Sequence, residues 1–161
     1  MSKTAKYWIE KLGLEKHPEG GWFKEIYRSA DLVQTENGQR SAGTSIYYLL
    51  EGNDFSALHR IRSDEIWHFY TGSSSVEISW IENKQLKTVR VGVDVDSGEC
   101  LQYVVPKNCW FAARLTDING FALVGCTVSL GFDFNDFELA DETLLRKFPD
   151  LIHQLAPLIR E

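Results

Sequence analysis

Short apolar or alternating segments, separated by turn-forming residues, fill the middle of the chain and constrain its fold more than any other feature. After an alternating segment that begins at Trp22, they run over residues 44–50, 55–61, 65–70, 76–82, 87–93, 101–105, 109–115 and 121–130. Asn37-Gly38 and Asn119-Gly120 are among the turn signals between them. Short strands with a turn about every 8–12 residues are typical of a β-sandwich or barrel rather than a parallel α/β sheet. The sequence therefore predicts an all-β core.

Both ends of the chain show helical spacing instead. Apolar residues recur at helical intervals from Ala5 to Leu12, and Gly13 suits a helix C-cap. A second amphipathic pattern follows Leu139, where Asn135 or Asp136 is expected to cap the helix. The length of 161 residues suits a single domain. We expect a helix and turn over residues 1–21, a strand core over 22–138 and C-terminal helices over 139–161.

Composition and charge exclude several classes of partner. The 17 basic and 23 acidic side chains give a net charge of −6, whereas nucleic-acid binders normally carry a basic excess. No apolar run approaches the roughly 20 residues that cross a bilayer, and the N-terminus lacks the apolar region of a secretory signal. Three widely spaced cysteines argue against a disulfide framework. We expect a cytoplasmic protein with neither a nucleic-acid nor a membrane partner.

The segment SALHRIRSDEIWHFYTGS carries the residues best suited to chemistry. If segments 55–61 and 65–70 are adjacent antiparallel strands, the turn between them brings His59 and Glu65 together. Such a pair suits either half of a metal site or a general acid/base pair, and the alternative is a hydrogen bond that joins two strands. Strand alternation places His68 on the opposite face from Glu65. His17 and His153 are expected to be solvated.

The spacing of His59, Glu65 and Gly72 resembles the first signature of the cupin superfamily, H-x-H-x(3–4)-E-x(6)-G. The wider text resembles one branch, the Cupin_5 family, once labelled a domain of unknown function; the matching blocks lie at residues 17–29, 45–50, 55–72, 104–113 and 123–140. This resemblance implies a double-stranded β-helix, or jelly roll, usually paired into a homodimer. It also implies a fold related to that of sugar-nucleotide epimerase-type cupins.

The sequence departs from the metal-binding cupin pattern at two positions. Ile61 stands where the signature has its second histidine, and Phe111 stands at the histidine of the second motif, P-x-G-x-x-H. A stable site for a first-row metal usually needs three or four protein ligands. The cofactor therefore stays open: His59 and Glu65 are candidate ligands for a divalent metal, with Gln102 or Glu25 as a third.

Aromatic residues occupy the strands that the resemblance places around the barrel pocket. The chain contains 5 Trp, 6 Tyr and 9 Phe, and aromatic rings stack well on sugars and planar heterocycles. The alternative is that these rings are simply core. Arg28 belongs to a charged block that matches the family and is expected to enter the pocket. The candidate ligand-binding residues are Arg28, Tyr47, Trp67, Phe69, Gln102, Tyr103 and Trp110, beside Phe111.

Three functions follow as alternatives. The first is a small-molecule-binding cupin whose pocket holds a sugar-like or heterocyclic ligand with His59 and Glu65. The second is a metal-free epimerase or isomerase, with His59 as general base and Tyr47 or Tyr103 as general acid, or a weakly metal-dependent enzyme. The third is a non-catalytic structural or interaction protein that acts through its dimer face.

Overall fold

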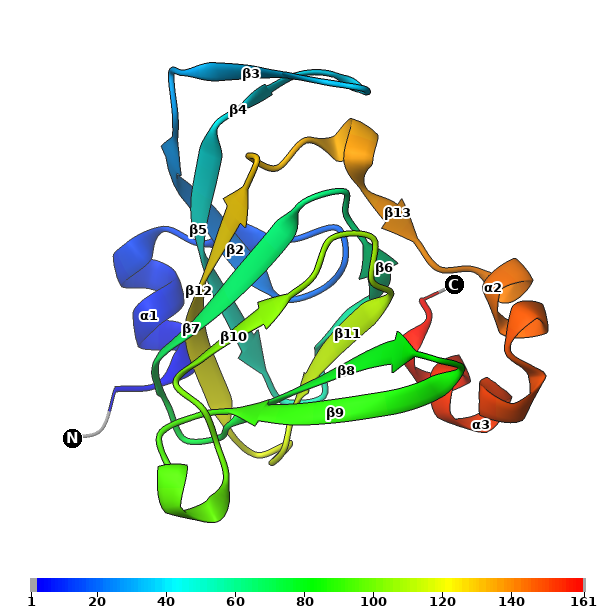
Figure 1. Cartoon of the computed structure of the whole chain (residues 1–161). Helices are drawn as coiled ribbons and strands as arrows, with labels where there is room; N and C mark the ends of the chain where they lie inside the picture. The colour runs from blue at the N-terminus through cyan, green and yellow to red at the C-terminus, as the bar shows by residue number, and fades with distance from the viewer. Residues whose placement is uncertain (1–2, 161) are drawn as a thin grey trace.

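Two antiparallel sheets form a barrel in the computed structural model, which describes residues 3–160 (Figure 1). One sheet contains, in order, β1 (Glu15–Lys16), β2 (Trp22–Arg28), β5 (Gly43–Glu51), β12 (Phe121–Ser129), β7 (Asp64–Gly72) and β10 (Gln102–Val105). The other contains β13 (Glu138–Leu139), β6 (Phe55–Arg60), β11 (Phe111–Leu115), β8 (Val76–Glu82) and β9 (Gln85–Val91). A separate hairpin of β3 (Leu32–Thr35) and β4 (Gly38–Ser41) projects from one end. This arrangement confirms the predicted all-β jelly roll.

One predicted pairing between neighbouring strands is wrong. Strands β6 and β7 follow each other in sequence but lie in different sheets: β6 pairs with β11 and β13, whereas β7 pairs with β12 and β10. The three residues between them turn the corner from one sheet to the other instead of closing a hairpin. His59 and Glu65 therefore approach each other across the barrel interior and not along one sheet.

Aromatic side chains fill the space between the two sheets. Tyr48, Trp67 and Phe111 are each 1% exposed, and they contact one another edge to face, with ring centroids 5.7 Å apart for Tyr48–Trp67 and 6.4 Å for Trp67–Phe111. Full burial of a large apolar side chain stabilises a fold by roughly 1.5–3 kcal/mol. These rings belong to the main buried cluster of the barrel, with Val76, Ile78 and Val124 around them.

Helix α1 (Ala5–Leu12) confirms the predicted N-terminal helix. Thr4 accepts a hydrogen bond from the backbone N–H of Tyr7 at its start, and Gly13 ends it in the left-handed conformation with φ 63°. The helix packs on the outer face of the six-stranded sheet, where its apolar side meets Leu49 and Leu123.

Short helices after β12 cover the other sheet. They are α2 (Glu142–Lys147), η3 (Pro149–Leu151), α3 (Ile152–Leu155) and η4 (Ala156–Leu158), while η2 (Phe134–Asp136) lies between β12 and β13 and η1 (Val95–Ser97) between β9 and β10. Leu151 and Leu155 pack with Leu58 of β6. Asp141 caps α2, so the expected capping by Asn135 or Asp136 is wrong. Within residues 3–160, no helix has the length and apolar character needed to span a bilayer.

Candidate functional site

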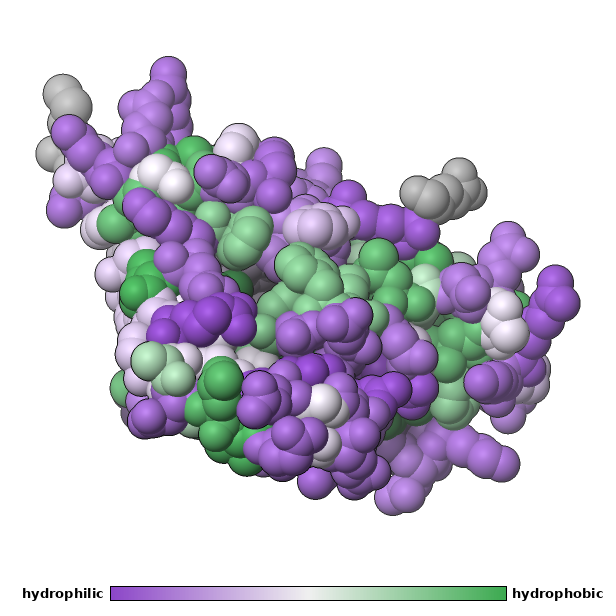
Figure 2. All heavy atoms as spheres, turned by 90° about the horizontal axis from the view of Figure 1, so that it is seen from above, coloured by the Kyte–Doolittle hydropathy of each residue, from purple (hydrophilic) through white to green (hydrophobic). Residues whose placement is uncertain are grey.

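A cavity of about 350 Å³ is lined by Arg28 of β2 and Thr44 of β5, at the end of the barrel where the chain leaves β2 for the β3–β4 hairpin. Figure 2 shows this end from above, with apolar side chains gathered around a hollow and hydrophilic side chains surrounding them. Strands β2, β5, β6, β7 and β12 and the segment after β12 supply its walls. The inner polar groups are His17, Glu19, His59, Glu65 and Cys126, and the apolar wall is formed by Phe23, Ile46, Ile61 and Val128.

His59 is held in one orientation at the inner end of the cavity. Its side chain is 3% exposed, and its Nδ1 lies 2.6 Å from the carbonyl oxygen of Ala57. A carbonyl only accepts hydrogen bonds, so the imidazole proton resides on Nδ1. The ring packs against Phe111, with centroids 4.2 Å apart. Burial lowers the pKa of His59, which leaves a neutral imidazole whose Nε2 accepts hydrogen bonds in the cavity.

Glu19 is the immediate partner of that nitrogen. Its Oε2 lies 3.2 Å from Nε2 of His59, and its side chain is 10% exposed. Burial raises the pKa of Glu19, against the opposing effects of His17, Ser56 and Arg160. A protonated Glu19 can donate to Nε2, and an ionised Glu19 can accept from a protonated His59. The two groups are thus arranged to share one proton.

The turn over residues 17–21 carries Glu19 into the barrel, and two glycines allow it. Gly20 and Gly21 have φ of 109° and 76°, where L side chains are strained. A Cβ on Gly21 would lie 2.9 Å from the carbonyl oxygen of Leu49. The hydroxyl of Tyr48 donates to the Gly20 carbonyl at 2.6 Å, and the Ala57 N–H donates to the Glu19 carbonyl at 2.9 Å. Strands β5 and β6 therefore hold this turn in place.

His17 lines the same cavity, so its predicted solvation is wrong. Its side chain is 7% exposed, and its ring meets the edge of Phe23 at 4.6 Å between centroids. The backbone N–H of Glu19 donates to Nδ1 at 3.1 Å, which places the proton of the neutral ring on Nε2. Burial lowers the pKa of His17, and the negative charge of Glu19 opposes this shift. His153, by contrast, is exposed as predicted.

Glu65 provides a second buried carboxyl group. It is 8% exposed, and burial raises its pKa to about 7, with His59 opposing the shift and Glu19 adding to it. Among residues 3–160, no backbone N–H or hydroxyl donates a hydrogen bond to its side chain, and the neighbouring Cys126 thiol is a weak donor. The carboxyl oxygens of Glu65 therefore face the cavity with most of their accepting capacity unused.

Arg28 reaches the cavity mouth because β2 contains a β-bulge. Glu25 pairs with Ile46 and Tyr27 pairs with Ser45, which leaves Ile26 as the extra residue. The bulge reverses the alternation, so that Arg28 joins Glu25 on the cavity side while Tyr27 is 56% exposed. Arg28 donates to Glu25 from Nε at 2.9 Å and from Nη2 at 2.8 Å.

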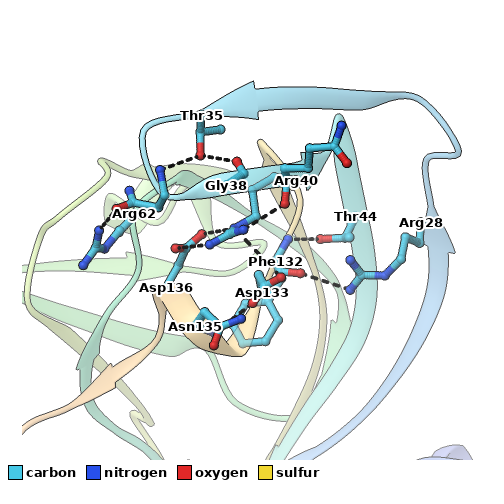
Figure 3. A network of polar contacts seen from close by, with 12 residues as sticks. Arg28, Thr35, Gly38, Arg40, Thr44, Arg62, Phe132, Asp133, Asn135 and Asp136 are labelled. Carbon is cyan, nitrogen blue, oxygen red and sulfur yellow. Dashed lines mark hydrogen bonds and ion pairs between the residues drawn. The ribbon is translucent and has the colours of Figure 1, made fainter.

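The segment after β12 forms the opposite side of the mouth (Figure 3). Phe132 is held twice: its N–H donates to the Thr44 hydroxyl at 2.9 Å, and its carbonyl accepts from Arg28 at 3.1 Å. Further along, Asp136 accepts from Arg40 of β4 at 2.7 and 2.9 Å, and both side chains of this ion pair are buried. The hairpin and this segment are therefore fastened together above the cavity.

The sequence matches the profile described as Cupin superfamily (DUF985) over residues 6–140, most of the chain. The chain belongs to the Cupin_5 family. Two solved structures are close to it throughout: a hypothetical protein from Leishmania major, 34% identical with a TM-score of 0.91, covers 99% of this chain and 100% of its own. A Shewanella oneidensis protein, 38% identical with a TM-score of 0.90, covers 99% of both chains.

A curated relative supports the same assignment. An uncharacterized protein of Saccharomyces cerevisiae is 32% identical over 159 residues, which span 89% of this chain and 76% of the yeast protein. Solved structures of more distant cupins share the fold at low sequence identity. The family, with its jelly roll, is therefore established for this Cupin_5 protein, as the sequence analysis predicted.

The metal ligands of metal-binding cupins do not fit this Cupin_5 cavity. Ile61 forms part of the apolar wall, and Phe111 is buried against the ring of His59. Gln102, suggested as a third ligand, lies on β10 outside the cavity lining, and Glu25 is bound to Arg28. Within residues 3–160, no three His, Cys, Asp or Glu side chains are grouped so as to hold a metal ion.

Of the candidate ligand-binding residues, only Arg28 lines the cavity beside His59 and Glu65. Trp67 and Phe69 point inward from β7 as Glu65 does, but they belong to the packed core deeper in the barrel. The prediction that Trp67 and Phe69 face the barrel interior is therefore correct. They lie deeper in the barrel than the cavity, however, and do not line it.

The other candidates occupy separate surroundings. Tyr103 packs against Trp80 at 5.3 Å between centroids, Trp110 lies under the guanidinium of Arg60, and Tyr47 meets Tyr70 at 6.1 Å between centroids. His17 and Glu19 were missed as site residues because strand alternation says nothing about a turn. The signal available was a histidine and a glutamate placed directly before two glycines.

Proposed function

We propose that this Cupin_5 protein binds a small molecule in the cavity, with the ligand's polar end against Glu65, Glu19 and His59. The cavity volume of about 350 Å³ lies in the range of roughly 300–1,000 Å³ that small-molecule sites occupy. Buried carboxyl groups normally have hydrogen-bonding partners, since leaving them without any is costly. The carboxyl group of Glu65, buried and facing open space, is the observation that carries the proposal.

Phenyl rings shape the rest of the proposed binding site. Phe23 lines the wall, and Phe132 and Phe134 meet edge to face at the mouth with centroids 4.9 Å apart. Such rings suit the face of a sugar or a planar heterocycle. The aromatic lining expected from the sequence is thus supplied by different residues.

Thermal-shift screening against nucleotide sugars, nucleobases and organic acids tests the proposal. A bound ligand raises the melting temperature through linkage, and Glu65→Gln should abolish the rise. Glu82→Gln, on the exposed end of β8, is the matched control and should leave the rise unchanged. A screen without hits, or a rise that persists in Glu65→Gln, would refute binding at this site.

A second candidate, a metal-independent epimerase or isomerase, is favoured by the 3.2 Å separation of His59 Nε2 from Glu19. In this reaction Nε2 takes the proton from a carbon next to a carbonyl, and the carboxyl group of Glu65 returns a proton to that carbon. A group with a pKa near 7 suits this exchange at neutral pH. Glu65 replaces Tyr47 and Tyr103 as the acid because neither tyrosine lines the cavity.

Solvent exchange distinguishes this enzyme from a binding protein. Incubation of a ligand from the screen in D₂O should place deuterium at the carbon next to the carbonyl, and His59→Gln should slow this by about 100-fold or more. If none of the binding carbonyl compounds exchanges, the protein is a binder and not an epimerase.

The homodimer implied by the family is a separate proposal. Ile26, Tyr27 and Leu32 are 49%, 56% and 61% exposed on β2 and β3, and a partner chain seated there would cover these apolar side chains. Light scattering should give twice the chain mass, and Leu32→Glu should shift the protein to monomer. A monomeric wild-type protein would refute the dimer.

A further inference from the structure

The charges around the cavity are strongly unequal. Four carboxyl groups line it, whereas Arg28 is the one guanidinium and no lysine is present among the lining residues that the structure describes. At the mouth, Glu25 is paired with Arg28 and Asp133 lies 3.9 Å from Arg40, so the imbalance resides in Glu19 and Glu65 at the inner end. Because the cavity is small, every ligand inside it lies close to several of these groups. This imbalance favours a ligand that brings positive charge.

Arg28 is not available to bind an anionic ligand. Its Nε and Nη2 donate to the two carboxylate oxygens of Glu25 at 2.9 and 2.8 Å, and Nη2 also donates to the Phe132 carbonyl at 3.1 Å. An anion would have to break this bidentate pair, and paired, charge-assisted hydrogen bonds are the stronger ones. The single positive charge of the lining is therefore already neutralised within the protein.

Hydrogen-bond acceptors dominate the inner end as well. His59 uses its Nδ1 proton on Ala57 and shares a proton between its Nε2 and Glu19, and Glu65 offers its carboxyl oxygens. The sole imidazole donor in the lining is Nε2 of His17, because Nδ1 of that ring accepts from Glu19. The buried Glu65 carboxyl, which no backbone N–H or hydroxyl reaches among residues 3–160, is the strongest acceptor left open.

We propose that the ligand is a small organic cation, an ammonium or amidinium group on a flat apolar body, whose N–H groups donate to Glu65 and Glu19. This inference rests on the proposed binding function and names the chemical class of its ligand. The rings of Phe23, Phe132 and Phe134 line the path from the mouth, and aromatic faces attract cations. The cation would supply both the charge and the donors that the inner end of the cavity lacks.

Three probes of nearly equal shape test this class: benzamidine, which is a cation, benzamide, which is neutral, and benzoate, which is an anion. Titration of the ¹⁵N-labelled full chain at about pH 7.5 and physiological salt should move the backbone resonances of Thr44 and Val128, which line the cavity. We expect benzamidine to bind at least about tenfold more tightly than benzamide, and benzoate to bind more weakly still.

Variants separate specific binding from general attraction to an acidic protein. Glu65→Gln, whose fold is checked by its urea transition, should weaken benzamidine binding by about tenfold or more and should weaken benzamide binding by clearly less. Glu82→Gln removes the same amount of negative charge from the protein surface, and it should change neither benzamidine nor benzamide binding. An unchanged benzamidine affinity in Glu65→Gln would overturn the proposal.

The outcomes also distinguish this inference from the proposed function. Benzoate or benzamide binding as tightly as benzamidine overturns the cationic class but leaves a small-molecule site. Failure of benzamidine to move the cavity resonances at about 10 mM, well above the Kd expected of a fragment, also overturns the cationic class. The proposed function itself fails only if the wider screen also yields no ligand.

Discussion

His59 Nε2 and Glu19 Oε2 lie 3.2 Å apart, although one residue belongs to β6 and the other to a turn before the first long strand. This short distance depends on backbone groups that hold each of the two residues in place. The Ala57 carbonyl occupies Nδ1 of His59, and the Ala57 N–H holds the carbonyl of Glu19. One residue of β6 thus fixes the orientation of both partners.

The two cavity histidines should adopt opposite tautomers near neutral pH. His59 donates from Nδ1 to a carbonyl, whereas His17 accepts at Nδ1 from a backbone N–H, and burial lowers the pKa of both. Long-range ¹H–¹⁵N correlation spectra should show a protonated Nδ1 in His59 and a protonated Nε2 in His17. Finding the same tautomer in both rings would contradict the geometry described for the turn.

Glu65 should make the folded state less stable as the pH rises through the weakly acidic range. Its pKa is raised from 4.5 to about 7, so the unfolded chain loses this proton first, and the free energy of unfolding falls between those values. The full effect is about 3 kcal/mol in order of magnitude. Glu65→Gln, which cannot ionise, should gain that much relative to wild type between about pH 4 and about pH 8.

Urea denaturation at about pH 4 and about pH 8 measures the difference in unfolding free energy between Glu65→Gln and the wild-type protein. The two histidines contribute an opposite slope, because groups with a lowered pKa destabilise the fold as the pH falls below their unfolded value near 6.5. Their contribution largely cancels when Glu65→Gln is compared with wild type at each pH. A pH-independent difference between the two proteins would show that the Glu65 carboxyl has a normal pKa.

Gly21→Ala should destabilise the protein more than Gly98→Ala, although both glycines have positive φ, at 76° and 87°. The strain of a left-handed alanine, about 1–2 kcal/mol, is common to both. At Gly21 the new Cβ would also lie 2.7 Å from the Tyr48 hydroxyl and 2.9 Å from the Leu49 carbonyl, whereas at Gly98 the space is open. The overlap should add about 1–3 kcal/mol, measured from urea transitions. Equal losses would mean that the turn can move away from β5.

Breaking the Arg40–Asp136 pair should lower the melting temperature by several degrees and weaken ligand binding. Asp136→Asn leaves the buried guanidinium with only the more distant Asp133 carboxylate, at 3.9 Å, which is more costly than removing both charges of the pair. The double variant Arg40→Met/Asp136→Leu should therefore recover much of the loss. Glu77→Gln breaks the more exposed pair with Arg114 and serves as the control, with a small expected effect. If the double variant is as unstable as Asp136→Asn, the loss of stability does not come from the unpaired charge of Arg40.

The sequence predicts the strands well because their alternation and turn residues are local signals. Helix α1 is equally local, with its apolar spacing and Gly13. His59 and Glu65 are found from their spacing, yet the reason for their proximity differs, since β6 and β7 belong to opposite sheets. Pairing between strands depends on the path of the whole chain, which neighbouring residues do not encode.

The cavity lining is harder to predict than the fold. Alternation indicates that Trp67 faces inward, but it does not say whether that level of the barrel is open or filled. Glu19 lies in a turn, where no periodic pattern indicates direction. These features depend on packing at one level of the barrel, and the linear pattern does not contain that information.

The bulge at Ile26 means that the composition of the entrance is decided by backbone length and not by residue choice alone. If Ile26 instead faced a partner of its own on β5, simple alternation would bring Tyr27, in place of Arg28, to the rim. A charged entrance would thereby become a phenolic one with every letter of β2 unchanged. Relatives whose β5 carries one more residue opposite the bulge should therefore admit different ligands through otherwise identical barrels.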